Sequence, residues 1–143
     1  MQFIIYIATI ILLIKIGYID YNQKIIPDKF NLILVLLGIF NLILNFQNCK
    51  IYIALAAITF AVFLFLTIIT DGGIGGGDIK LFTVLGLIFG NDILIIIIAS
   101  FTIATIVSII RVMLRQINMK ESIALAPYIC AGTIICLIKI YIF

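Results

Sequence analysis

A glycine-rich loop separates two apolar runs in residues 51–89, which read IYIALAAITFAVFLFLTIITDGGIGGGDIKLFTVLGLIF. The first run, residues 51–70, contains no charged residue and has the length of a membrane-crossing helix, about 20 residues. The second run, residues 79–89, would rise only about 16 Å as a helix, which is less than the roughly 30 Å hydrocarbon core. This stretch predicts membrane helices of unequal length joined by a loop of unusual backbone freedom.

The composition of the whole chain agrees with this interpretation. Of its 143 residues, 66% are hydrophobic and 10% are charged, whereas soluble domains average about 45–50% and about 25%. A soluble globule of this size has too little interior to bury so much hydrocarbon. We therefore expect an all-α, polytopic membrane protein with a single domain over residues 1–143. The N-terminus has neither a basic start nor a small-residue cleavage site, so we expect it to remain as the first span.

Hydropathy divides the chain into six apolar segments, and the fourth is short enough to be a re-entrant loop instead of a crossing. The segments are residues 3–19, 30–46, 51–70, 79–89, 93–110 and 122–143. If all six cross, one side of the membrane receives six basic residues and the other side two; if the fourth turns back, the division is four to four. Because cytoplasmic loops are enriched in Lys and Arg, we predict six crossings, with both termini outside. The predicted cytoplasmic residues are Lys24, Lys29, Lys80, Arg111, Arg115 and Lys120, against Lys50 and Lys139 outside.

The residue inventory excludes several kinds of chemistry. The chain has no histidine, which removes Ser-His-Asp and Cys-His catalytic systems and the HExxH zinc motif. Its three cysteines, Cys49, Cys130 and Cys136, form no CxxC pair, and we expect no metal site and no cofactor. The net charge of +3 is scattered through apolar sequence, so we expect no nucleic-acid partner.

Two aspartates remain as candidates for catalysis. Asp20 follows the first segment and Asp78 precedes the fourth, and the predicted topology places both at the cytoplasmic face. Two neighbouring carboxyl groups do not both ionise easily, so one stays protonated near neutral pH. One member of such a pair activates water while the other protonates a peptide carbonyl, which is aspartyl protease chemistry. A cation pathway through a non-enzymatic transporter or channel subunit is the alternative use of two acidic residues in a membrane.

The glycines beside Asp78 favour the protease. Gly75, Gly76 and Gly77 lack Cβ atoms, so an extended substrate backbone has room beside the carboxylate. A phosphate-binding loop is excluded because its pattern, GxxxxGK[ST], is not met: Lys80 is followed by Leu81. We therefore expect Gly75–Gly77 to contact the substrate.

Three motifs in order resemble those of the type IV prepilin peptidases, a family of GxGD intramembrane aspartyl proteases. They are DYNQKIIPD at residues 20–28, GIGGGDIKL at residues 73–81, and a proline early in the last segment, Pro127, followed by Ala131-Gly132. The resemblance implies that Asp20 and Asp78 are the catalytic pair, with Pro127 near the substrate. It also implies cleavage of the short basic leader of prepilin-like precursors at the cytoplasmic membrane surface. Because the chain lacks paired CxxC motifs, it resembles the short, peptidase-only branch, without methyltransferase activity.

Three further charged residues have more ordinary interpretations. Asp28 follows a proline and precedes an apolar run, so we expect it to be the N-cap of the second helix. Asp71 opens the glycine-rich loop outside the GxGD motif, and binding of the basic leader is a hypothesis for it. Lys15 lies within the first segment, where it would snorkel toward the interface or pair with an acidic group. Neither the particular pilin-like substrate nor the oligomeric state follows from the sequence.

Overall fold

The computed structural model describes residues 1–114 and 123–142, which form helices joined by short loops and turns, without a strand among them. These residues form α1 (Gln2–Gln23), α2 (Asp28–Leu44), α3 (Cys49–Ile69), α4 (Gly76–Phe89), α5 (Ile93–Met113) and α6 (Ala126–Ile142). Short 3₁₀ turns, Phe46–Asn48 and Gly90–Asp92, join α2 to α3 and α4 to α5. The predicted all-α class is therefore confirmed for the described part of the chain.

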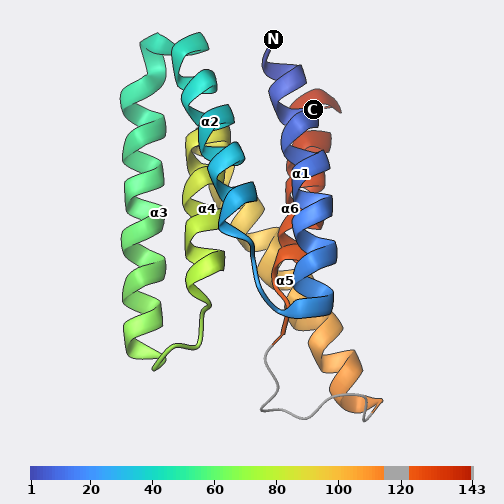
Figure 1. Ribbon diagram of the computed structural model, residues 1–143. Helices are drawn as coiled ribbons and strands as arrows, with labels where there is room; N and C mark the ends of the chain where they lie inside the picture. The colour runs from blue at the N-terminus through green and yellow to red at the C-terminus, as the bar shows by residue number, and fades with distance from the viewer. Residues whose placement is uncertain (115–122, 143) are drawn as a thin grey trace.

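Successive helices run in opposite directions, and both chain termini lie at the upper end of the bundle in Figure 1. At the lower end of that view lie the last turn of α1 and the first turns of α4 and α6. The most extensive contacts join α4 to α2 and α3, and join α6 to α1 and α5. Elements that are far apart in the sequence thus meet at the lower end.

The outer surfaces of the helices are apolar, as expected for contact with lipid. On α3, for example, Ile58, Phe65 and Ile68 are more than half exposed. Three helical stretches of the described residues are long and apolar enough to cross a membrane: Gln2–Gln23, Phe46–Ile69 and Gly76–Met113. The third stretch contains both α4 and α5, while α2 and α6, at 17 residues each, fall below that length. The chain is a membrane protein on these grounds, and the count of six crossings stays a prediction.

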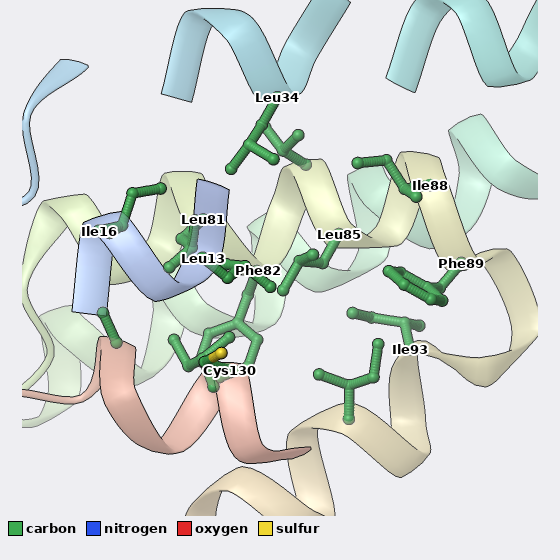
Figure 2. Close-up of a cluster of buried hydrophobic side chains, with 14 of the residues drawn as sticks. Leu13, Ile16, Leu34, Leu81, Phe82, Leu85, Ile88, Phe89, Ile93 and Cys130 are labelled. Carbon is green, nitrogen blue, oxygen red and sulfur yellow. The ribbon is translucent and has the colours of Figure 1, made fainter. Parts of the chain in front are cut away.

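Helix α4 is the centre of the core. It has only 14 residues, and eight of them are buried, so the prediction of a short fourth helix is confirmed. Figure 2 shows Phe82, Leu85 and Ile88 of α4 among side chains from α1, α2, α5 and α6. Phe82 also stacks on Phe63 of α3 and Phe101 of α5, with ring centroids 4.7 and 5.8 Å apart. Because most of α4 is covered by other helices and not by lipid, its length need not match the thickness of the bilayer.

The helix boundaries differ from the predicted segments by a few residues. Helix α1 continues past the apolar run to Gln23, so Asp20 lies within its last turn and not after its end. Helix α4 begins at Gly76, which places Asp78 in its first turn. Hydropathy marks only the apolar part of a helix, whereas hydrogen bonding continues into polar turns. The predicted ends of the sixth segment, Ser122 and Phe143, lie outside the described residues, as do Arg115 and Lys120.

The interpretation of Asp28 as a helix N-cap is wrong. Pro27 occupies the N-cap position of α2 with φ −68° and ψ 127°, and Asp28 is the first helical residue. Proline has its φ fixed near this value and lacks an N–H, so it suits the helix start. The Asp28 carboxylate instead contacts Lys80 of α4, with 2.7 Å between Oδ1 and Nζ.

Candidate active site

A cavity of about 420 Å³ opens where α1 ends and α4 begins, and both predicted catalytic residues line it. Asp20 and Asp78 are 58 positions apart in the sequence, and the fold brings them to one cavity. Its walls come from α1, the α3–α4 loop, α5 and the residues that precede α6. The lining residues are Asp20, Lys24, Gly72, Gly73, Ile74, Gly75, Asp78, Phe101, Ile123, Ala124 and Leu125. We call this end of the bundle the cavity end.

Asp20 is held in place by a helix from the other end of the sequence. Its side chain is buried, and Oδ2 accepts a hydrogen bond from the backbone N–H of Ala126 at 3.0 Å. Ala126 is the first residue of α6, and the first N–H groups of a helix have no partner within that helix. The Asp20 carboxylate supplies such a partner and meets the positive end of the α6 dipole. Burial and this hydrogen bond together give Asp20 a defined orientation at the cavity wall.

Asp78 is less completely paired. One of its carboxyl oxygens, Oδ1, is fully buried and has no hydrogen-bond partner among the described residues. A Cβ atom at Gly75 would lie 3.1 Å from the other oxygen, Oδ2, so the glycine leaves space for the carboxyl group. Buried polar oxygens are normally hydrogen-bonded, so this oxygen has free hydrogen-bonding capacity at the cavity.

The other predicted substrate-binding residues divide into two groups. Gly75 lines the cavity, whereas Gly76 and Gly77 do not. Gly77 faces the side chain of Ile26, and a Cβ atom at position 77 would lie 2.9 Å from the Ile26 Cβ. No atom lies within 4 Å of the position that a Gly76 Cβ would take. The three consecutive glycines therefore have three different surroundings.

Pro127 and Asp71 also lie outside the cavity lining. Pro127 contacts α1, where a Cβ atom at Gly17 would lie 3.2 Å from the Pro127 Cα. It lines a shallower apolar depression with Tyr18 and Tyr21. Asp71 is exposed, with a left-handed φ of 48° at the end of α3. Their roles in binding substrate stay predictions. Lys15 is likewise exposed on α1 and does not line the cavity.

Sequence reasoning missed several lining residues. Lys24 follows Asp20 by four positions, one helical turn, and this spacing was a usable signal. It takes a left-handed φ of 53° as the C-cap of α1, and its N–H bonds to the Asp20 carbonyl at 2.8 Å. Phe101 and Leu125 had no comparable signal, because they are apolar residues in apolar surroundings. Only packing selects them from their neighbours.

The described residues thus form a helical membrane protein with the carboxyl groups of Asp20 and Asp78 at one cavity. Comparison with known proteins identifies the family: residues 7–109 match the type IV leader peptidase family. The chain belongs to this family. Among curated proteins it is 35% identical over 86 residues to the prepilin peptidase EppA of Methanocaldococcus jannaschii. It is 29% identical over 134 residues to the prepilin leader peptidase/N-methyltransferase of Bacillus subtilis.

These two alignments cover the relatives only in part. The first includes 60% of this chain and 24% of the Methanocaldococcus protein. The second includes 90% of this chain and 53% of the Bacillus protein. The chain thus spans about half or less of the length of each relative. No solved structure matches it significantly.

Proposed function

We propose that this protein is a membrane-embedded aspartyl endopeptidase that removes the short basic leader from type IV prepilin-like precursors. Asp20 and Asp78 are the catalytic pair in this proposal. The single observation that supports it most is their presence at one cavity, in a chain of the leader peptidase family. The proposal covers the peptidase step alone, without a metal or a cofactor.

The chemistry needs one ionised and one protonated carboxyl group. The ionised member takes a proton from water as the water oxygen attacks the scissile carbonyl carbon, and the protonated member gives its proton to the carbonyl oxygen. The tetrahedral intermediate then collapses: the C–N bond breaks, and the leaving nitrogen receives the proton that was taken from water. A hydroxyl group of the intermediate returns its proton to the other carboxylate as the carbonyl of the product acid forms. Both carboxyl groups return to their starting states. Since a coupled pair titrates as a unit, we assign the two roles jointly.

The surroundings of the two carboxyl groups suit this reaction. The unpartnered Oδ1 of Asp78 has hydrogen-bonding capacity for a water molecule or a substrate carbonyl. The Ala126 N–H holds Asp20 in one orientation, and such preorganisation contributes to catalysis. Gly72, Gly73 and Gly75 line the cavity without side chains, so an extended substrate backbone has access beside Asp78.

The distribution of basic residues supports a cytoplasmic location for the cavity. Lys24, Lys29, Lys80 and Arg111 lie on segments that end or begin at the cavity end. Lys50 and Lys139 lie toward the other end, near the start of α3 and the end of α6. By the positive-inside rule, the cavity end faces the cytoplasm, and both termini lie outside. The partners are then a prepilin-like precursor and the lipid bilayer.

The test is cleavage of a leader-bearing prepilin-like precursor by the purified protein in lipid vesicles. Asp20→Asn and Asp78→Asn should each lower the cleavage rate by at least about a hundredfold, as expected for loss of acid–base catalysis. Asp92→Asn is the matched control, because Asp92 lies in the turn between α4 and α5, away from the cavity lining. This variant should cleave the precursor at the wild-type rate. Near-normal cleavage by either active-site variant would refute the assignment.

The same vesicles test the alternative of a cation pathway. The match to a peptidase family favours proteolysis, and we expect no cation flux that depends on Asp20 and Asp78. A wild-type protein that cleaves nothing but conducts cations, and loses conduction in both asparagine variants, would replace the peptidase proposal with the transport one.

A further inference from the structure

The linker between α1 and α2, together with the first residue of α2, contacts the beginning of α4 at two adjacent points. The Asp28 carboxylate forms an ion pair with Lys80, at 2.7 Å between Oδ1 and Nζ. Beside it, the Ile26 side chain occupies the space that a Cβ atom at Gly77 would require. We call these two contacts, made by Ile26, Asp28, Gly77 and Lys80, the linker clasp.

The linker clasp lies on one face of α4. Gly77 and Lys80 are three residues apart, so they lie on the same face of the helix. Asp78 is the next residue after Gly77 and points about 100° away from it around the axis, and it lines the cavity. A rotation of the first turn that moved Asp78 would therefore also break the contacts of Gly77 and Lys80.

The other side of the linker clasp is attached directly to Asp20. Ile26 and Asp28 follow Asp20 by only six and eight residues. The connection is constrained at two positions: Lys24 caps α1 in a left-handed conformation, and Pro27 has φ −68°. The connection is therefore short and constrained, and it joins Asp20 on α1 to the contacts that Ile26 and Asp28 make with α4.

We propose that Asp28 and Lys80 are positioning residues, which hold the Asp78 carboxyl group in register with Asp20 across the cavity. This inference rests on the proposed catalytic roles of the two aspartates. Both members of the ion pair are largely exposed, with 78% and 56% of their side chains accessible. Exposed ion pairs contribute little to stability, so breaking this one should leave the fold intact and allow its effect on cleavage to be measured. Its loss lowers kcat and leaves KM and folding nearly unchanged.

A second ion pair provides a matched control. Lys139 of α6 contacts Asp92 at 3.0 Å, between Nζ and Oδ1, in the turn that precedes α5. Like the Asp28–Lys80 pair, it joins the beginning of one helix to another helix. Asp28→Lys and Asp92→Lys each place a lysine near a helix N-terminus, with a similar penalty from the helix dipole, whereas Lys139→Asp adds a further penalty because Lys139 lies in the last turn of α6. The Asp92–Lys139 pair differs in position, because it lies at the end of the bundle opposite Asp20 and Asp78.

The experiment measures kcat and KM for precursor cleavage in vesicles, and thermal unfolding in parallel. Asp28→Lys and Lys80→Asp should each lower kcat about tenfold, because two like charges then face each other across the linker clasp. The double variant restores the ion pair in reverse and should recover kcat to within about threefold of wild type. The corresponding single and double exchanges at Asp92 and Lys139 should leave kcat unchanged.

Each other outcome contradicts the inference. If Lys80 contacted the substrate directly, the double exchange would fail to restore kcat, and the positioning role would be wrong. Equal losses at the Asp92–Lys139 pair would indicate a general effect on folding. If a charge reversal prevents folding, the neutral variants Asp28→Asn and Lys80→Met take its place. Each should lower kcat about threefold. An unchanged kcat in both variants would refute the inference. An inactive wild type would refute the proposed function itself, whereas an active wild type without rescue would refute only the positioning role.

Discussion

The two ends of the bundle differ in how completely their buried polar groups are hydrogen-bonded. At the end opposite the cavity, Asn41 of α2 donates from Nδ2 to the carbonyl of Ile88 at 3.0 Å and, more weakly, to that of Leu87 at 3.4 Å. These carbonyls belong to the last turn of α4, where a helix leaves acceptors without partners. The turn that follows begins at Gly90, with φ 54° beneath the ring of Tyr52. A residue with a side chain would meet both strain and a clash there.

At the cavity end, two residues have buried polar atoms without partners. Asp78 Oδ1 and both polar atoms of Asn31, in the first turn of α2, have none among residues 1–114 and 123–142. A buried polar group without a partner costs about 1–3 kcal/mol. The opposite end therefore satisfies the polar groups at the end of α4, whereas the cavity end leaves Asp78 Oδ1 with free hydrogen-bonding capacity. Under the proposed function, this capacity serves the substrate.

The largest effect should follow from removing the unpaired carboxyl group. Asp78→Leu eliminates a buried oxygen that has no partner. Cleavage should fall by more than about a hundredfold, while the free energy of unfolding rises by about 1 kcal/mol. Thermal unfolding in detergent, together with the precursor cleavage assay, measures both quantities. A less stable Asp78→Leu protein would mean that the carboxyl group stabilises the fold and that the two ends do not differ in this way.

An intermediate effect, on stability, should follow at the opposite end. Asn41→Leu removes the donor to the Ile88 and Leu87 carbonyls, and the free energy of unfolding should fall by about 2 kcal/mol. The kcat of the folded fraction should remain that of wild type, because Asn41 lies outside the cavity lining. A change in kcat without a change in stability would contradict the proposed division between the two ends.

The smallest effect is expected from a single methyl group. Gly77→Ala places a Cβ atom 2.9 Å from the Ile26 Cβ, so the linker must move, and kcat should fall about fivefold. Gly38→Ala is the control, because it introduces a comparable contact, 3.1 Å to the Leu87 Cβ, in the half of α2 and α4 farther from the cavity. It should cost stability and leave kcat unchanged. Equal kcat losses in both variants would indicate that any disturbance of the α2–α4 packing impairs cleavage.

Much of the architecture was predictable from local chemistry. Continuous apolar runs with few charges predict membrane helices because a bilayer offers no hydrogen-bond partners to an exposed backbone. The absence of histidine directed attention to the carboxylates, and Asp20 and Asp78 do meet at one cavity. The roles of single residues were harder to predict. Asp28 suggested a helix cap and proved to be an ion-pair partner of Lys80, because the approach of α4 to the start of α2 is not encoded locally.

The amino-acid sequence alone was sufficient to predict a helical membrane protein, a short fourth helix and two candidate aspartates, since these depend on composition, run length and a short motif. The different surroundings of Gly75, Gly76 and Gly77 came only from the tertiary structure. So did the hydrogen bond between Asp20 and Ala126, residues 106 positions apart. Such features depend on which helix faces meet, and in a chain that is apolar nearly everywhere, the hydrophobic pattern does not distinguish the face that meets a neighbour from the face that meets lipid.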